Sequence, residues 1–384
     1  MASQKRKSKP SSTPLGRRLG QLTERAFWVV NLVCLAPVVL SLLAPWVSPA
    51  QAPWLGYLAL GVPLLLLVPV VWLVFWCVYG IRRAVPNLVV LLVHLGSLSA
   101  LVQLPGGGAE SDTGFRVVSY NVNAFYYDTE AIARTFATLK RLAPDVLLLQ
   151  EYYGNDNRRR RPLTDSLARH LGLPHRAVLP LAGRYFGLAV FSRYPIVAHG
   201  RVWPVAEGGS TTNGIQWADI ALYGRRLRLY NLHLASYFTG ERLAGSDPSV
   251  PETWGHVLGV ALPKAWQEQE AQLAALGRHR STCPYPVVVA GDLNNPPFGY
   301  AYRSAHQGLH DAFRHQGQWA MPTYTTTPIP YRIDYIFADP SLTVLSYASP
   351  PETASDHRPV VAELSFLAPD GTTEAPADGT DLPG

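Results

Sequence analysis

Three long apolar runs constrain the N-terminal part of this 384-residue chain. They cover residues 27–47, 54–79 and 85–104, and none contains Asp, Glu, Lys or Arg. Each run is near the ~20 residues that a helix needs to cross the hydrocarbon core of a bilayer. Buried helices of soluble proteins are rarely this long without a charge. The runs therefore predict three transmembrane helices over 27–104, which makes the lipid bilayer an expected partner.

The charged residues that flank the runs predict their orientation. Residues 1–26 hold seven basic residues and one acidic residue, and Arg82-Arg83 lie between the second and third runs. Basic flanks stay in the cytoplasm, so 1–26 is predicted to be a basic cytoplasmic tail. Three crossings then place everything after 104 on the extracytoplasmic side of the cell membrane. Alternatively, Ser48-Pro49-Ala50 resembles a signal-peptide cleavage site, which would leave the C-terminal domain on the same side.

The rest of the chain predicts one globular domain with flexible flanks. Residues 105–114 are a Gly-rich polar linker, 115–367 an α/β domain, and 368–384 a disordered tail. Apolar strand patterns that follow one another directly outnumber strict strand–helix alternation. This pattern favours two packed mixed β-sheets flanked by helices, a four-layer α/β sandwich. Helices are expected at 129–142, 163–171, 261–279 and 299–307.

The charge balance of the C-terminal part narrows the function classes. Residues 105–384 contain 24 basic and 26 acidic residues, although the whole chain carries a net charge of +6. Sequence-independent DNA binding relies on an excess of Lys and Arg over the phosphate backbone. Binding to bulk duplex DNA is therefore not expected.

Polar residues follow the apolar strands of the domain at the points where the strands end. Residues i and i+2 of a strand share a face, so Asp292 and Asn294 are expected to point into one site, as are Asn231 and His233. Several such ends together predict a single cleft. The polar residues at these ends are Asn121, Glu151, Asn231, His233, Asp292, Asn294, Asp334, Asp356 and His357.

The residue types in this set indicate a hard cation and a phosphate. Their carboxylate and amide oxygens are the ligands that Mg²⁺ or Mn²⁺ prefers, and no Cys or His pair at zinc spacing occurs. The two histidines offer acid, base or charge-stabilising groups, and Asp334 is expected to hold His357 in one tautomer. Neither a serine nucleophile elbow nor a Gly-rich phosphate loop is present in the sequence. Water is therefore the expected nucleophile.

Seven short motifs in a fixed order give the domain a family resemblance. Over about 115–366 the chain resembles the endonuclease/exonuclease/phosphatase superfamily, which includes deoxyribonuclease-like nucleases, abasic-site endonucleases, inositol polyphosphate phosphatases and neutral sphingomyelinases. The motifs are SYNV (119–122), LLLQE (147–151), LAVFSRYPI (188–196), NLHL (231–234), GDLNNPP (291–297), RIDYIF (332–337) and SDHRPV (355–360).

The resemblance implies a role for each matching residue. The implied metal residues are Asn121, Glu151 and Asp356, with Glu151 the principal ligand. Asn123 stands where other members have Asp, which leaves the number of metals open.

The implied catalytic and substrate residues complete the set. Asp292 would activate the attacking water, Asn294 would hold a phosphate oxygen, and His357, held by Asp334, would stabilise charge on phosphorus. His233 would act as an acid or phosphate ligand, and its strand neighbour Asn231 is expected to bind substrate.

For some of these residues the sequence also allows a purely structural role. Asn121 could cap a turn, Asp292 could form one, and Asp334 could pair with Arg332. The run Arg158–Arg161 is expected to be a solvated loop or an anion contact, and 237–266 a lid or a membrane-facing element.

Together these features predict a membrane-anchored, Mg²⁺-dependent phosphohydrolase. It would hydrolyse a phosphodiester or phosphomonoester by metal-assisted in-line attack of water, with a lipid, inositol or small-nucleotide substrate preferred. One alternative is an extracytoplasmic nuclease acting on DNA or RNA. An alternative of another class is a catalytically inactive module that binds a phosphate ligand. Neither the substrate nor the oligomeric state follows from the sequence.

Overall fold

A computed structural model describes most of the chain and divides it into two compact units. The first unit is formed by 1–42 and 61–95, and the second by 43–60 and 96–384. Most of the predicted linker, the C-terminal tail, the Arg158–Arg160 part of the arginine run and most of 237–266 lie outside the described residues. The described ranges are 14–106, 114–127, 129–156, 161–182, 186–202, 213–237, 255, 257–327, 329–352 and 354–367.

The N-terminal region is helical. Residues Arg18–Leu43 form one helix long and apolar enough to cross a membrane. Two further pairs, Pro53–Leu65 with Leu67–Tyr79 and Ile81–Val93 with Leu95–Leu101, pass the same test only when each bent pair counts as one span. The elements are α1 Pro14–Leu40, η1 Ser41–Leu43, α2 Pro53–Leu65, α3 Leu67–Tyr79, η2 Ile81–Arg83, α4 Val85–Val93 and α5 Leu95–Leu101.

Helix α1 begins well before the first apolar run. The basic segment ahead of Phe27 continues the helix because Leu, Arg, Gln and Glu are good helix formers. Within the first unit, buried amides link three helices: Trp76 Nε1 donates to Asn31 Oδ1 at 2.7 Å, and Asn87 Nδ2 donates to the same oxygen at 3.0 Å. Arg83 forms an ion pair with Glu24. Polar contacts of this kind hold apolar helices together where water is absent.

The second unit contains two mixed six-stranded sheets, as predicted. The first has the order β13-β14-β1-β2-β6-β5, and the second β11-β12-β10-β9-β8-β7. Strands β1 and β2 are parallel, as are β9 and β10, while their other neighbours are antiparallel. The first-sheet strands are β1 Phe115–Asn121, β2 Val146–Tyr153, β5 His175–Ala182, β6 Phe186–Ser192, β13 Leu342–Ala348 and β14 Val360–Phe366. The second-sheet strands are β7 Ile196–Arg201, β8 Gly214–Leu222, β9 Arg225–His233, β10 Val287–Asp292, β11 His310–Asp311 and β12 Asp334–Ala338.

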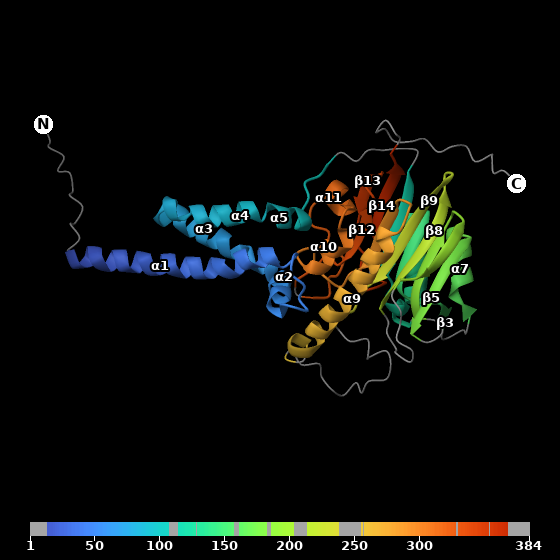
Figure 1. The fold of residues 1–384 in the computed structure, drawn as a ribbon, viewed down its shortest axis with the longest axis horizontal. Helices are drawn as coiled ribbons and strands as arrows, with labels where there is room; N and C mark the ends of the chain where they lie inside the picture. The colour runs from blue at the N-terminus through green and yellow to red at the C-terminus, as the bar shows by residue number, and fades with distance from the viewer. Residues whose placement is uncertain are drawn as a thin grey trace. The chain divides into compact units, whose positions relative to one another are not determined.

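Helices cover the outer faces of both sheets, which gives the predicted four layers. Leu139 and Leu167 pack from α6 and α7 onto the first sheet, and Leu273 and Ala301 pack from α9 and α10 onto the second. Helix α9 runs along the second sheet (Figure 1). The helices are α6 Thr129–Leu142, α7 Leu163–Leu171, α9 Leu262–Ser281, α10 Tyr300–His306 and α11 Ala312–Gln316. Shorter elements are η3 Asn123–Tyr127, β3 Asn155–Asp156, β4 Arg161–Pro162 and the π-helical turn η5 Val257–Ala261.

The interior between the two sheets is apolar along most of its length. Val117, Leu148, Leu229, Ala290 and Ile336 all face this layer and are fully buried. Because side chains alternate along a strand, the residues two positions further along β1, β9 and β10 face the same layer. The fold therefore directs the ends of these strands toward one another.

Candidate active site

The polar residues cluster at one end of the layer between the sheets. Asn121 ends β1, His233 ends β9 and Asp292 ends β10. Asp334 begins the antiparallel strand β12, where it pairs with Asp292 in register. Parallel strands bring their carboxyl ends to the same edge of a sheet, and the antiparallel β12 brings its first residue there. Side chains from both sheets therefore lie together at this end of the layer between the sheets.

Two backbone irregularities add residues that alternation alone would direct elsewhere. Glu151 has φ 48° and Asn294 has φ 50°. The register of β2 against β6 shifts between Leu149 and Tyr152, on either side of Glu151. Left-handed backbone costs energy for a non-glycine residue and often marks a functional site. At Glu151 this turn brings the carboxylate to Asn121, whose Nδ2 donates to Glu151 Oε1 at 3.2 Å.

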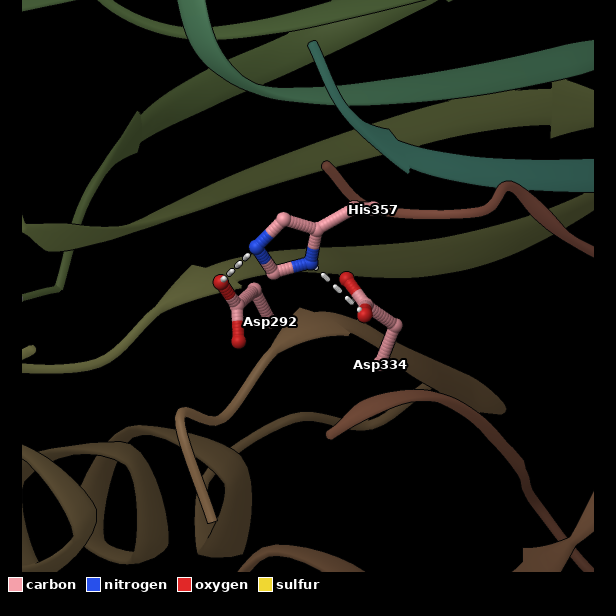
Figure 2. A group of neighbouring side chains, drawn as sticks. All are labelled: Asp292, Asp334 and His357. Atoms are coloured by element: carbon pink, nitrogen blue, oxygen red, sulfur yellow. Dashed lines mark hydrogen bonds and ion pairs between the residues drawn. The ribbon is translucent and has the colours of Figure 1, made fainter. Parts of the chain in front are cut away.

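His357 lies between two buried carboxylates (Figure 2). Its Nδ1 is 2.9 Å from Asp334 Oδ2, and its Nε2 is 3.7 Å from Asp292 Oδ2. Burial alone would lower the pKa of His357, but the carboxylates of Asp334 and Asp292 outweigh it and raise that pKa to about 10. Burial raises the pKa of Asp292, and the charge of His357 offsets part of this effect. His357 is therefore a cation at neutral pH, held in one orientation by Asp334.

The other half of the cluster surrounds Glu151. His233 Nε2 lies 3.5 Å from Glu151 Oε1 and 3.8 Å from Asp292 Oδ2. Asn121 Nδ2 donates to Asp292 Oδ2 at 3.0 Å as well as to Glu151. On its far side, Asn121 Oδ1 accepts a bond from the Asn123 backbone N–H at 3.0 Å. One amide thus separates two carboxylates that face the same space.

This arrangement fits a divalent cation. Two carboxylates bonded to one amide nitrogen repel each other, and a cation beside them would offset that repulsion. Asp292, Asp334 and His357 also bring one ligand atom each within 4.8 Å of one another. A protonated imidazole cannot bind a metal, and His357 has a pKa raised to about 10. The geometry therefore favours Glu151 and Asp292 over the His357 side as the place for the ion.

Asp356 lies beside this group through Asn123. Asn123 Nδ2 donates to Asp356 Oδ1 at 2.9 Å. Ser355 Oγ donates to the Asn121 backbone oxygen at 2.8 Å, which ties this loop to the end of β1. The amide of Asn123 therefore donates a hydrogen bond to Asp356. An Asp at position 123 would instead add a negative charge beside Asp356.

The structure brings all but one of the predicted site residues together. Asn231 is the exception, because its side chain lies between the sheets and bonds within the protein. Its Nδ2 donates to the Leu149 and Ala189 backbone oxygens at 3.0 and 3.2 Å, and its Oδ1 accepts from Gln150 Nε2 at 2.7 Å. Asn231 therefore links strands of the two sheets, and we no longer expect it to bind substrate.

The contacts of Arg332 decide the simpler alternative for Asp334, and those of Asn294 place its side chain. Arg332 pairs with Asp311, at 2.9 Å, and not with Asp334. Asn294 Nδ2 donates to the Leu234 backbone oxygen at 3.0 Å, and its N–H donates to Asp292 Oδ1 at 2.7 Å. An amide nitrogen carries two hydrogens, so Asn294 Nδ2 can donate to a ligand as well as to Leu234.

Three further residues support the site without a signal in the local sequence. Thr323 Oγ1 accepts from the Asp334 N–H at 3.1 Å, and the Tyr324 ring lies 5.0 Å from the His357 ring. Asn213 Nδ2 lies 3.4 Å from the His233 ring nitrogens. All three lie ten or more residues from the side chains they contact. Only the tertiary fold reveals them.

The family of the chain follows from its sequence. The Endonuclease/Exonuclease/phosphatase family matches residues 118–357, and the chain belongs to this family. Its members hydrolyse phosphoester bonds and are generally dependent on divalent metals, so the protein is a hydrolase of phosphoric ester bonds. A domain of unknown function (DUF8431) matches residues 24–101. No curated protein sequence matches the chain.

Several solved structures are similar to about two thirds of the chain. An endonuclease/exonuclease/phosphatase from Beutenbergia cavernae DSM 12333 has 23% identity, with 66% of this chain and 72% of that chain covered and a TM-score of 0.47. The 3' phosphatase NExo from Neisseria has 17% identity over 66% and 100% of the two chains, with a TM-score of 0.48. The beta toxin from Staphylococcus aureus has 16% identity over 65% and 99%, with a TM-score of 0.43.

Proposed function

We propose that this protein is a membrane-anchored, Mg²⁺-dependent phosphohydrolase whose catalytic domain lies outside the cytoplasm. The observation that carries the proposal is the cluster of Glu151, Asp292 and His357 in a chain that also contains a helix long and apolar enough to cross a membrane. The substrate we propose is a lipid, inositol or small-nucleotide phosphoester.

The residues of the cluster have complementary roles in this proposal. Bound beside Glu151 and Asp292, Mg²⁺ would supply positive charge to a phosphate oxygen. Asp292 accepts a proton from water as the water oxygen bonds to phosphorus and the bond to the leaving oxygen breaks. His357 stabilises negative charge on the phosphate oxygens, Asn294 orients the phosphate, and His233 protonates the leaving oxygen.

Hydrolysis of a generic phosphodiester tests the proposal. The full chain in lipid nanodiscs should hydrolyse bis(p-nitrophenyl) phosphate with Mg²⁺ and lose this activity with EDTA. The full chain is preferable to a fragment that begins at 105, because 43–60 belongs to the same compact unit as the sheets. A wild-type protein that binds the phosphodiester without hydrolysing it would support the inactive binding module.

Low affinity for duplex DNA is expected. Residues 105–384 carry slightly more acidic than basic residues, so few phosphates would be neutralised. The logarithm of DNA affinity should fall with the logarithm of salt concentration with a slope of about −2 or shallower. A slope of about −6 or steeper, together with faster turnover of DNA than of phospholipid vesicles, would favour the extracytoplasmic nuclease.

A reporter fused after residue 384 tests the proposed topology. A reporter that is active only in the cytoplasm should give no signal there, because basic flanks keep the N-terminal tail inside and three spans leave the C-terminus outside. The same reporter fused before residue 1 is the matched control and should be active. Strong activity of the C-terminal fusion would contradict the proposed localisation.

A further inference from the structure

The residues that join the first two apolar helices belong to the catalytic unit. This interhelical segment, defined as Leu43–Leu60, includes the first two turns of α2 and clusters with the sheets, whereas α1 and the rest of α2 belong to the first unit. Ser48 Oγ donates to Glu270 Oε2 at 2.6 Å, and Arg303 stacks over the Trp46 ring at 3.1 Å. The segment is thus attached to both α9 and α10.

One set of contacts leads from the interhelical segment to the loop that carries Asn294. The Tyr57 ring meets the Trp266 ring edge-on at 5.1 Å, and the Tyr57 hydroxyl donates to the Leu258 backbone oxygen. Trp266 is 2% exposed. A methyl group on Gly56 would come within 2.6 Å of the Trp266 ring, so only glycine allows this approach. The close fit fixes α9 against the segment.

From Trp266 the contacts continue to the residue that follows Asn294. The Tyr237 ring packs against Trp266 at 6.4 Å, and its hydroxyl donates to Asn295 Oδ1 at 2.6 Å. Asn295 Nδ2 in turn donates to Gln269 Oε1 at 2.7 Å, one turn along α9 from Trp266. The Asn295 side chain is therefore held on both of its polar atoms, by Tyr237, which packs against Trp266, and by Gln269 of α9.

A second set of contacts leads to His357. The Tyr331 hydroxyl donates to the Leu60 backbone oxygen at 2.8 Å. The backbones of Tyr331 and Tyr324 exchange hydrogen bonds at 2.9 and 3.0 Å, and the Tyr324 ring packs against His357. The interhelical segment is thus linked through two intermediate residues to Asn295, which follows Asn294, and through two others to His357.

We propose that the interhelical segment positions the catalytic loops and that Tyr57 and Tyr331 are positioning residues for the proposed hydrolysis. Tyr57 contacts Trp266 and the Leu258 backbone, and Tyr331 contacts the Leu60 backbone, so both act on the site through the residues that pack beyond them. Displacement of a catalytic group by about 1 Å can lower turnover by about 100-fold. Loss of either contact should therefore lower kcat and change KM little.

Steady-state kinetics of the full chain in nanodiscs tests this inference, which rests on the proposed function. With bis(p-nitrophenyl) phosphate and Mg²⁺, Tyr57→Ala should lower kcat by about 10-fold or more and change KM by less than about twofold. Tyr57→Phe keeps the ring contact and should recover most of the loss. Trp54→Ala removes an aromatic ring that is 49% exposed on the same helix and should match the wild type. Equal kcat values for Tyr57→Ala and Trp54→Ala would overturn the inference.

Hydrogen exchange provides a readout that does not depend on activity. The backbone N–H groups of Leu293, Tyr324 and Tyr331 are hydrogen-bonded in the structure. They should exchange faster in Tyr57→Ala and Tyr331→Phe than in the wild type, while the amides of β1 stay unchanged. If the wild type hydrolyses nothing, the proposed function fails, and the exchange rates still decide the positioning role. Unchanged exchange in both variants would overturn it.

Discussion

Replacement of Glu151 by Gln is expected to abolish metal-dependent hydrolysis while the fold is retained. The amide has the size of the carboxylate and can still accept the bond from Asn121 Nδ2, but it lacks the charge that holds a divalent cation. At limiting Mg²⁺, kcat/KM should fall by about 100-fold or more. Phosphodiester hydrolysis over a series of Mg²⁺ concentrations measures the effect.

The control is the same chemical change at an exposed glutamate. Glu130 lies on α6 with its side chain 86% exposed, 3.6 Å from Arg134, so Glu130→Gln should keep wild-type activity. Mg²⁺ should raise the melting temperature of the wild type and of Glu130→Gln, because a ligand that binds only the native state stabilises it. If Glu151→Gln keeps the wild-type rate at limiting Mg²⁺, Glu151 is not the principal ligand.

Strand alternation in the sequence predicts the architecture and one part of the site. Alternation along β1, β9 and β10 shows which residues share a face, and Asn121, His233 and Asp292 end strands whose same faces carry the buried apolar residues Val117, Leu229 and Ala290. A polar residue at the end of such a row has few places to lie except the end of the buried layer. The four-layer fold and the cluster at one edge follow from this pattern.

Periodicity cannot identify the partner that a buried side chain finds on another sheet. Asn231 shares its face with His233, as predicted, but lies deeper between the sheets, where Gln150 and two backbone oxygens satisfy its amide. A buried amide with three such bonds is a structural link, since leaving these groups unpaired would be costly. Asn231 and His233 share a face of β9, but Asn231 lies two residues before the end of the strand and links the sheets, whereas His233 ends the strand and lies at the site.

The N-terminal region shows a second limit of sequence patterns. Hydropathy groups 54–79 into one run, yet α2 and α3 meet at a bend of 45°, and the first part of α2 belongs to the catalytic unit. Gly56, Tyr57 and Leu60 look like ordinary residues of an apolar helix. Their contacts with Trp266 and Tyr331 depend on residues more than 200 positions away, which no local pattern encodes.

His357 and Asp334 are expected to act as one unit in catalysis. His357→Ala should lower kcat by about 100-fold or more, with less change in KM, because it removes a charged donor that acts on the transition state. Asp334→Asn should also lower kcat, since an amide cannot stabilise the imidazolium as the carboxylate does at 2.9 Å. The loss of kcat in the double variant should be much smaller than the product of the two single losses.

The control for removal of an imidazole is His199→Ala. His199 lies on the exposed face of β7, so this change should leave kcat unchanged.

The pH dependence separates this coupling from a structural role of Asp334. The carboxylates raise the pKa of His357 from its ordinary value of 6.5 to about 10. Charged His357 therefore stabilises the fold fully below pH 6.5, and this contribution is lost as the pH rises through about 10. The wild-type rate should decline on the same alkaline side, and Asp334→Asn should move that decline to lower pH because the imidazolium loses its main partner. Multiplicative losses in the double variant, with an unmoved alkaline limb in Asp334→Asn, would show that His357 works without Asp334.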